Sequence, residues 1–377
     1  MSNQNNLRPS KTPGKVRIVS LDVARGWMLI TSVTSVAVLA PRPDWLVHAS
    51  WRGITLYDLI FPLFVTLSGV GMAFAYKRKV DLKVTLRRVV VLTTVGLLYN
   101  GVSSGSWDPS TFRFTGVLQL YAVLVAVIAL AHFVLKTWKA WAITTLVSSA
   151  LFALLFCYIA SNCVLGTPTP MCNLSLAIDY PLFGDHMLAQ GRLGHDPEGL
   201  VSILGAILTA IGGTTAGHMT LQYMNTNLRS LGLRLTAWAG VLLVWGFGLS
   251  FLFPAFKRLW TPPFALIAGS AGLLLFATAF LAFDLIGRSL NSPTVAKVAW
   301  PFAALGRNSL LVYFGSHLVI AVLARNYLPG SDIPLTYQIA EAISVGLPGN
   351  LEFVLLNLVA WWVLAIVLHR KQIYIRA

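Results

Sequence analysis

Charged residues are scarce in this chain of 377 residues. Asp, Glu, Lys and Arg make up 11% of the sequence, against about a quarter in soluble domains, and 56% of the residues are hydrophobic. A soluble fold of this length could not cover so much apolar surface with so few charges. Apolar segments of about 20 residues, long enough to cross a bilayer, recur along the whole chain. The composition therefore excludes a soluble protein and predicts an all-α, polytopic integral membrane protein.

Cysteine is also rare, with three residues in the chain. Their spacing matches no metal-binding pattern, so we expect no metal site. Cys157 lies in an apolar segment, where a free cysteine is most simply a small packing residue. Cys163 and Cys172 fall in one long loop on the predicted outer side. That compartment permits a disulfide, but the sequence leaves open whether these two residues form one.

Acidic residues are outnumbered, with 13 Asp and Glu against 28 Lys and Arg, for a formal net charge of +15. Such an excess can indicate nucleic-acid binding. Its distribution instead favours a topological origin, because a cytoplasmic N-terminus places about 20 Lys and Arg inside and about seven outside, as the positive-inside rule predicts. We therefore expect a lipid bilayer, and no nucleic acid, as a partner.

About ten segments are long and apolar enough to be predicted as membrane spans. Residues 1–18 are predicted to be a cytoplasmic tail without a cleavable signal, and residues 19–377 a single transmembrane domain in the plasma (inner) membrane. An even number of spans returns the basic C-terminus to the cytoplasm, and the longest external loop covers about 162–198. The predicted spans are 19–40, 54–76, 87–104, 114–134, 139–161, 199–221, 231–252, 262–284, 300–324 and 350–369.

A histidine and an aspartate stand close together at the start of the second span. Asp58 begins an apolar helix, where an unpaired charge is costly, and His48 precedes it by ten residues in an external loop. The loop can fold His48 back over the helix. A carboxylate that holds one imidazole nitrogen leaves the other nitrogen free to act as a base. The alternative is that Asp58 only caps the helix and His48 is a solvated loop residue.

Charged residues also gather at the predicted cytoplasmic ends of the spans. Arg307 lies in apolar sequence, where a charge usually lines a cavity or contacts a ligand, and Arg288 and Lys297 precede it. Asp22 and Arg25 stand at the entrance of the first span. Together these residues could bind a phosphorylated ligand. For Asp22 and Arg25 the alternative is stabilisation by the helix dipole and snorkelling of the arginine.

Several other polar residues have a structural explanation beside a functional one. Asp196 and Pro197 precede the sixth span and predict an N-cap with proline in the first helical position. A cap needs only one acid, so it does not account for Glu198. Gln119 and His317 lie within spans, where each could join helices by hydrogen bonds or contact a ligand.

These segments together resemble the heparan-α-glucosaminide N-acetyltransferase family, which has lysosomal and bacterial members and belongs to the transmembrane acyltransferase superfamily. The resemblance is spread in order over nearly the whole chain, and its most specific segment runs from His48 to Pro62. One departure is Leu120, which follows Gln119 where the family usually has Arg. The matching segments are 20–26, 48–62, 116–119, 196–199, 259–260 and 306–313.

The resemblance implies transfer of an acetyl group from cytoplasmic acetyl-CoA to an amino sugar or glycan at the outer face. The family's catalytic histidine and nearby aspartate match His48 and Asp58, and the family suggests a homodimer. Residues expected at the acetyl-CoA site are Asp22, Arg25, Gln119, Arg288, Arg307, Asn308 and Ser309. Residues expected at the acceptor site are Trp51, Asp196, Glu198 and Trp260.

Several alternatives stay open at this point. A carrier that moves a sugar without acyl transfer is the alternative function. The acceptor, the acyl-chain length and the choice between N- and O-acylation are not determined. His48 could act as a general base or form an acetyl-histidine intermediate.

Overall fold

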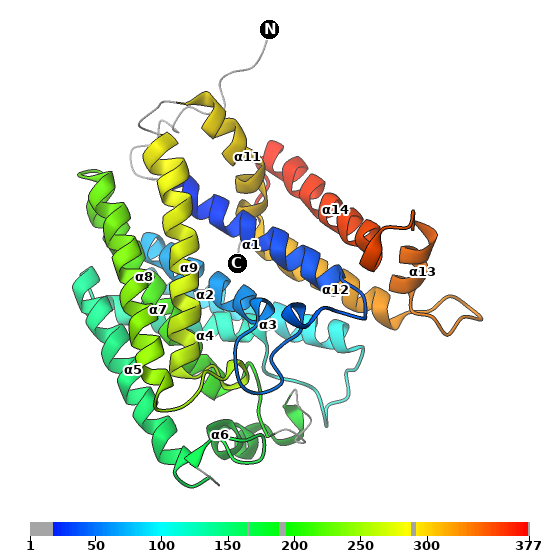
Figure 1. The fold of residues 1–377 in the computed structure, drawn as a ribbon, viewed down its shortest axis with the longest axis horizontal. Helices are drawn as coiled ribbons and strands as arrows, with labels where there is room; N and C mark the ends of the chain where they lie inside the picture. The colour runs from blue at the N-terminus through cyan, green and yellow to red at the C-terminus, as the bar shows by residue number, and fades with distance from the viewer. Residues whose placement is uncertain (1–17, 164–165, 188–193, 288–291, 376–377) are drawn as a thin grey trace.

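A computed structural model describes residues 18–163, 166–187, 194–287 and 292–375. Across these residues the chain is helical, with isolated β-bridges and no strand, which confirms an all-α polytopic membrane protein (Figure 1). The longer helices are α1 (Val19–Ala37), α2 (Leu56–Tyr76), α3 (Leu82–Ser104), α4 (Val117–Val134), α5 (Trp138–Ala160), α7 (Leu200–Tyr223), α8 (Leu228–Ser250), α9 (Pro262–Ala279), α11 (Pro293–Arg307), α12 (Ser309–Arg325) and α14 (Leu351–Arg370). The short helix α6 (Leu174–Phe183) lies in the predicted external loop 162–198, and the short helix α13 (Leu335–Ala342) lies between the last two predicted spans.

A helix lies at each of the ten predicted spans, but not every helix is apolar enough to count as a span. Among the described residues, seven helices are long and apolar enough to cross a membrane, and the bent pair α11 and α12 raises the number to eight. The other two helices, α1 and α3, carry charged residues such as Arg25 and Arg87. The predicted number of about ten is therefore not confirmed by length and composition.

The predicted span 300–324 is wrong as a single helix. The chain bends by 64° between α11 and α12, with Asn308 at the break. Asn308 has backbone angles of φ −109° and ψ 29°, outside the helical range, whereas Pro301 lies within α11 without ending it. The side chain of Asn308 is fully buried and accepts a hydrogen bond from the backbone N–H of Ile375. The break therefore occurs where an asparagine side chain binds another segment.

Helix α1 is held in place by contacts that its own sequence does not reveal. In its first turn, the N–H of Ser20 donates to the buried carboxylate of Asp284 at 3.0 Å. Asp284 belongs to the π-helical segment η6 (Phe280–Ile286). Helix α11 packs directly on the backbone of α1. A Cβ atom at Gly306 would lie 1.8 Å from the carbonyl oxygen of Asp22, so only glycine permits this approach.

Helices α2 and α7 make an equally close crossing in the core. A Cβ at Gly69 would lie 2.1 Å from the carbonyl oxygen of Ala210, and one at Gly213 would lie 2.1 Å from that of Thr66. Small residues let transmembrane helices approach each other in this way. The two reciprocal contacts fix α2 against the most buried long helix of the described chain.

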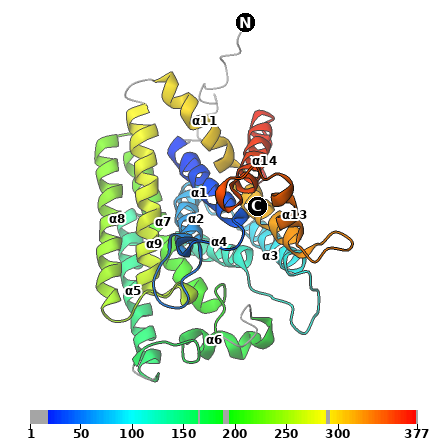
Figure 2. The same ribbon diagram turned by 45° about the vertical axis from the view of Figure 1, so that its right-hand side comes forward.

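Different segments of the chain lie at the two ends of the helix bundle. Helix α6 and the loop that follows α1 lie at one end, and α11 lies at the opposite end, in both views (Figures 1 and 2). We call these the α6 end and the α11 end. The predicted topology assigns the α6 end to the outside and the α11 end to the cytoplasm.

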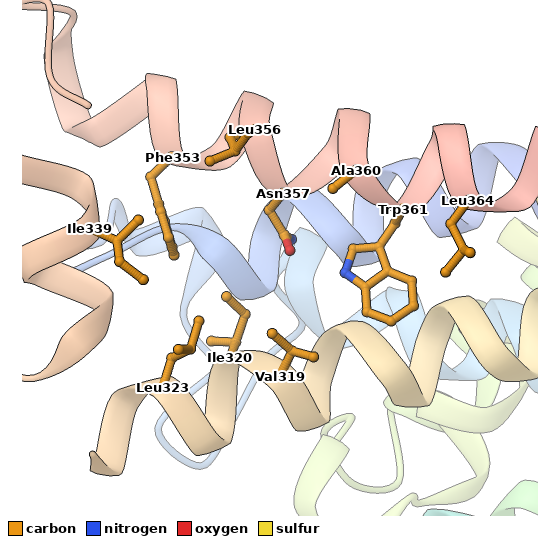
Figure 3. A pocket seen from close by; sticks show the side chains of 10 residues that line it. All are labelled: Val319, Ile320, Leu323, Ile339, Phe353, Leu356, Asn357, Ala360, Trp361 and Leu364. Carbon is orange, nitrogen blue, oxygen red and sulfur yellow. The ribbon is translucent and has the colours of Figure 1, made fainter. Parts of the chain in front are cut away.

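An apolar groove of about 360 Å³ lies between α12, α13 and α14 (Figure 3). Its lining side chains, which include Phe353 and Trp361, are apolar except for Asn357. The amide of Asn357 donates to the carbonyl oxygen of Val33 on α1. With no titratable group in its lining, this groove does not have the chemistry of an acyl-transfer site.

The glycine crossing gives a direct test of the packing. Gly69→Ala should lower the free energy of unfolding by about 1–3 kcal/mol, because the added methyl group would overlap the backbone of α7. Gly240→Ala in α8 is the matched control, since a Cβ there meets no atom within 4 Å. The midpoint of thermal unfolding in detergent measures both effects. Equal midpoints for the two variants would contradict the close crossing.

Candidate active site

His48 and Asp58 form a hydrogen-bonded pair at the α6 end. The His48 Nδ1 atom lies 2.7 Å from Asp58 Oδ1, and the Asp58 side chain is fully buried while that of His48 is 43% exposed. Since a carboxylate only accepts hydrogen bonds, Nδ1 carries the proton and Nε2 is left as an acceptor. Asp58 also forms a capping box with Thr55. Asp58 therefore caps α2 and also contacts His48, and the catalytic role of the pair stays a prediction.

Neighbouring segments hold the histidine loop against the bundle. The N–H of Gly53 donates to the carbonyl oxygen of Ala255 at 3.1 Å, in the loop before the 3-10 turn η5 (Lys257–Leu259). The indole N–H of Trp51 donates to the carbonyl oxygen of Pro168 at 3.0 Å, and its ring meets the buried His195 edge-on. The loop that carries His48 is therefore fixed on both sides.

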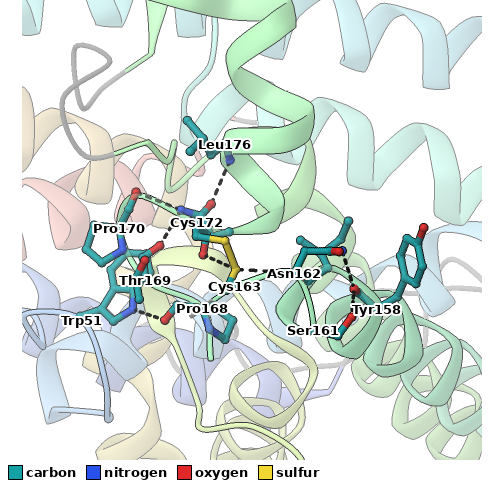
Figure 4. The surroundings of a disulfide bond; sticks show 12 residues. Trp51, Tyr158, Ser161, Asn162, Cys163, Pro168, Thr169, Pro170, Cys172 and Leu176 are labelled. Atoms are coloured by element: carbon teal, nitrogen blue, oxygen red, sulfur yellow. Dashed lines mark hydrogen bonds between the residues drawn. A yellow bond between two sulfur atoms is a disulfide. The ribbon is translucent and has the colours of Figure 1, made fainter. Parts of the chain in front are cut away.

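Cys163 and Cys172 form a disulfide, which settles the alternative that the sequence left open (Figure 4). The bond closes the short segment that presents the carbonyl oxygen of Pro168 to Trp51. Directly after it, Asn173 caps α6 by accepting from the N–H of Leu176. The disulfide thus supports both Trp51 and α6.

A buried ion-pair network lies beside this loop. The guanidinium of Arg113 donates to Asp196 at 2.8 Å and to Glu198, and Thr115 donates to the other oxygen of Asp196 at 2.5 Å. Asp196 is not the helix cap that the sequence predicted, because α7 begins later, at Leu200. Its carboxylate instead binds a loop more than eighty residues away in the chain.

The residue that caps α7 is Asp179 of α6. Its carboxylate accepts from the N–H of Leu200 at 2.8 Å and from the hydroxyl of Ser175 at 2.5 Å. The side chain is fully buried, and this desolvation raises the pKa of Asp179 to about 6, with a smaller contribution from the nearby charge of Asp196. The carboxylate is therefore expected to change charge within the physiological range.

Lys257 in η5 is a further cation near the His48–Asp58 pair. Burial lowers the pKa of its ammonium group, and the opposing, smaller effect comes from the negative charges of Glu198 and Asp58. Its neighbour Arg258 lies 3.4 Å from the Nε2 atom of His195. Positive charge is thus concentrated next to His48 at the α6 end.

Two predicted ligand residues lie in the core near this end. Trp260 is 1% exposed and donates its indole N–H to the hydroxyl of Thr209, which gives it a packing role in the structure. Gln119 lies in the first turn of α4 beside Gly96 and Asn100. Both polar atoms of its side-chain amide are buried without a hydrogen-bond partner among the described residues.

The residues predicted to bind a phosphorylated donor lie nearer the opposite end. Arg25 donates to the carbonyl oxygen of Leu67 at 3.1 Å, and its guanidinium occupies the space beside Gly71 on α2. Asp22 lies one turn before Arg25 on α1, where its backbone contacts Gly306. The close packing of α1 and α11 therefore brings the predicted Asp22 and Arg25 near the segment around residue 306.

The guanidinium of Arg307 contacts the last turn of α14 and the segment that follows this helix. Its Nη1 atom lies 3.2 Å from His369 Nδ1, and its carbon lies 3.6 Å from the centre of the Tyr374 ring. Asn308 is buried at the helix break and Ser309 begins α12. Arg288, which was also predicted to bind the donor, lies outside the described residues.

Comparison with known proteins relates the chain to one family. Residues 17–178 match the family described as "Heparan-alpha-glucosaminide N-acetyltransferase, catalytic". The chain is 24% identical over 430 residues to "Heparan-alpha-glucosaminide N-acetyltransferase" of Homo sapiens, and 24% identical over 421 residues to that of Mus musculus. The alignments cover 97% and 95% of this chain and 60% of each relative, so the chain spans about 60% of the length of these proteins. The chain is thus similar to heparan-α-glucosaminide N-acetyltransferases over most of its length.

The match to the N-acetyltransferase family model covers one part of the candidate site. His48, Asp58, Arg113 and both cysteines of the disulfide lie within residues 17–178. Asp196, Glu198 and Arg307 lie beyond it, within the longer alignments to the two curated proteins. The histidine–aspartate pair therefore lies in the part of the chain that the family model matches.

Three residues of the candidate site, Arg113, Asp179 and Lys257, were not predicted from the sequence as site residues. One available signal was the position of Arg113 between Phe112 and Phe114, since a lone charge among aromatic residues beside a span needs a partner. Which acid binds it depends on the tertiary fold.

The buried carboxylate of Asp179 predicts a pH dependence of stability. With a pKa of about 6 in the folded state and 3.8 as the ordinary value, the folded protein holds the proton more tightly, so this group's contribution to stability falls as pH rises from about 4 to about 6. Asp179→Asn should therefore melt at a higher temperature than the wild type at pH 7.5 and at a similar temperature at pH 4. A lower melting temperature at pH 7.5 would show that the ionised carboxylate stabilises the cap.

Proposed function

We propose that this protein is a membrane-embedded acetyltransferase that moves an acetyl group from acetyl-CoA to an amino sugar or glycan. The observation that carries the proposal is the His48–Asp58 pair, in which a buried carboxylate orients an exposed histidine. The family relationship supports the reaction class, since both curated relatives are named as N-acetyltransferases of a glucosaminide. The acceptor would bind at the α6 end, which the predicted topology places outside.

His48 acts as the general base in this proposal. Its Nε2 atom takes a proton from the acceptor amine while the amine nitrogen attacks the thioester carbonyl carbon. The C–N bond forms, the C–S bond breaks, and the CoA thiolate leaves and takes up a proton. Histidine is the side chain that most often takes such a proton in enzymes. Direct transfer and an acetyl-histidine intermediate both use the same free nitrogen.

Asp58 supports the base by stabilising one tautomer. One of its oxygens faces His48 Nδ1, and the other accepts hydrogen bonds from Thr55 and from the N–H of Ala49. These donors hold the carboxylate in one orientation and favour its charged form. The imidazolium that forms during proton transfer is then next to a negative charge, which stabilises it.

The donor must reach His48 from the α11 end if acetyl-CoA binds on the cytoplasmic side. Helix α2 rises by about 20 Å between Asp58 and Gly71, at 1.5 Å per residue. Arg25 contacts the helix beside Gly71, while Phe61 contacts Tyr121 and Trp260 nearer the His48–Asp58 pair. We propose that the uncharged pantetheine arm runs along α2 and that its nucleotide stays with the basic residues.

Replacing the base is the sharpest test of the proposal. His48→Ala should lower acetyl transfer to glucosamine, used as a probe acceptor, by about 10² to 10⁴ without changing CoA affinity. Asp58→Asn should lower it by a smaller factor, because the histidine loses its orienting charge. Release of the CoA thiol measures the rate. His186→Ala is the matched control, since His186, in the turn directly after α6, contacts the carbonyl oxygen of Phe112 and the ring of Phe114.

The pH profile separates the open alternatives. If the acceptor is an amine, part of the activity of His48→Ala should return at high pH, where the amine loses its proton unaided. A hydroxyl acceptor should show no such return. Normal turnover of His48→Ala at neutral pH would refute the proposed base. Sugar exchange across liposomes by a wild-type protein without transferase activity would favour the carrier.

The proposed direction of transfer has its own test. A cysteine introduced at Ser50, beside His48, should react with an impermeant maleimide in intact cells, and one introduced at Asp81 should react only after permeabilisation. Ser50 is exposed in the histidine loop, and Asp81 is exposed at the opposite end of α2. Labelling at Asp81 with protection at Ser50 would invert the proposed topology.

A further inference from the structure

We propose that the segment after α14, residues 371–375, is part of the acetyl-CoA site and that Tyr374 is a positioning residue for Arg307. This inference rests on the proposed function, because it assumes that Arg307 binds a phosphate group of the donor. It adds a segment that neither the sequence pattern nor the family comparison assigned. The ligand that it names is the nucleotide part of acetyl-CoA.

The chain reverses direction sharply after α14. Gln372 has a left-handed backbone with a φ of 58°, and the N–H of Ile373 donates back to the carbonyl oxygen of Leu368 at 2.9 Å. The side-chain amide of Gln372 donates to the carbonyl oxygen of His369 at 3.0 Å. This turn returns the segment 371–375 towards the junction of α11 and α12.

The returning segment contacts that junction at two adjacent residues. The N–H of Ile375 donates to the side-chain oxygen of Asn308 at 3.3 Å, and the ring of Tyr374 lies under the guanidinium of Arg307 at 3.6 Å. A cation at this distance over an aromatic ring is attracted to the negative face of the ring. The orientation of Arg307 therefore depends on a residue beyond the last helix.

His369 links the arginine to the tyrosine. Its Nδ1 atom lies 3.2 Å from Nη1 of Arg307 and 3.1 Å from the hydroxyl oxygen of Tyr374. Because a guanidinium can only donate, Nδ1 is an acceptor without a proton. Arg307 is thus held from one side by an imidazole nitrogen and from another by an aromatic face.

The composition of this cluster fits a nucleotide. Arg370 lies over the ring of Trp300 at 5.8 Å, and Trp300 also meets His369 edge-on, so cations and aromatic rings alternate around Arg307. Guanidinium groups bind phosphates with strong, directional hydrogen bonds, and aromatic rings stack on bases. A guanidinium that is already oriented loses less freedom on binding, which favours affinity.

The test compares Tyr374 variants by their affinity for CoA. In the purified full-length protein, Tyr374→Leu should raise the dissociation constant for CoA about tenfold, and Tyr374→Phe by at most about threefold, because phenylalanine keeps the ring under Arg307. Isothermal titration with CoA measures both. Tyr158→Leu is the matched control, since Tyr158 is 69% exposed on α5. Tyr374→Gln serves as a second variant if Tyr374→Leu does not purify as a folded protein.

Kinetics and a double variant distinguish positioning from a general structural effect. Tyr374→Leu should raise the KM for acetyl-CoA about tenfold with kcat changed less than twofold, whereas a damaged fold would lower kcat. Arg307→Ala combined with Tyr374→Leu should bind CoA no more than twofold weaker than Arg307→Ala alone, because both act through one contact.

Three results would overturn the inference. The first is unchanged CoA binding by Tyr374→Leu, whether or not Arg307→Ala is impaired. The second is tighter binding by Tyr374→Leu, which would make the segment a plug over the site. The third is additive losses in the double variant. If the wild type itself binds no CoA, the proposed function fails and this inference fails with it; CoA binding that is unaffected by Tyr374 refutes the inference alone.

Discussion

The buried carboxylate of Asp58 is the constraint on which the rest of the candidate site depends. A charged group at the start of an apolar helix is costly unless all its acceptor positions are used. Asp58 meets this requirement with His48, Ala49 and Thr55, so the loop cannot leave the helix without exposing an unpaired buried charge. The same contacts that stabilise the start of α2 therefore also place the proposed base, and structural and functional roles coincide in one residue.

The α6 end is held together by polar contacts between loops rather than by apolar packing. Arg113, Asp196 and Glu198 come from two loops far apart in the chain, and Asp196 is fully buried beneath the arginine. Removing one partner of such a network leaves an uncompensated charge, which is far more destabilising than losing an exposed pair. The disulfide adds a covalent connection next to Trp51. The proposed acceptor site thus has rigid walls although it is built from loops.

The sequence predicts the helices and the histidine pair because both follow from local rules. Apolar segments of sufficient length must form helices in a bilayer, and an acid as costly as Asp58 needs a partner within reach. Asp196 was misassigned as a cap because a local pattern, acid followed by proline, could not show that α7 begins at Leu200. The partners of Arg113 and Arg307 depend on how distant segments pack. The break at Asn308 likewise depends on Ile375, which lies 67 residues further along the chain.

Helix α2 joins the two ends of the proposed reaction path, and its rigidity follows from its neighbours. Its first turn carries Asp58, and its backbone at Leu67 accepts the hydrogen bond from Arg25. Next to Leu67, Gly69 of α2 and Gly213 of α7 hold the two helices at backbone contact distance, which leaves little freedom for sliding or rotation. A donor bound at one end would therefore meet a base at a constant separation from it. Because the two sites share one rigid helix, the length of the pantetheine arm, and not a movement of the helix, would determine whether the thioester reaches His48.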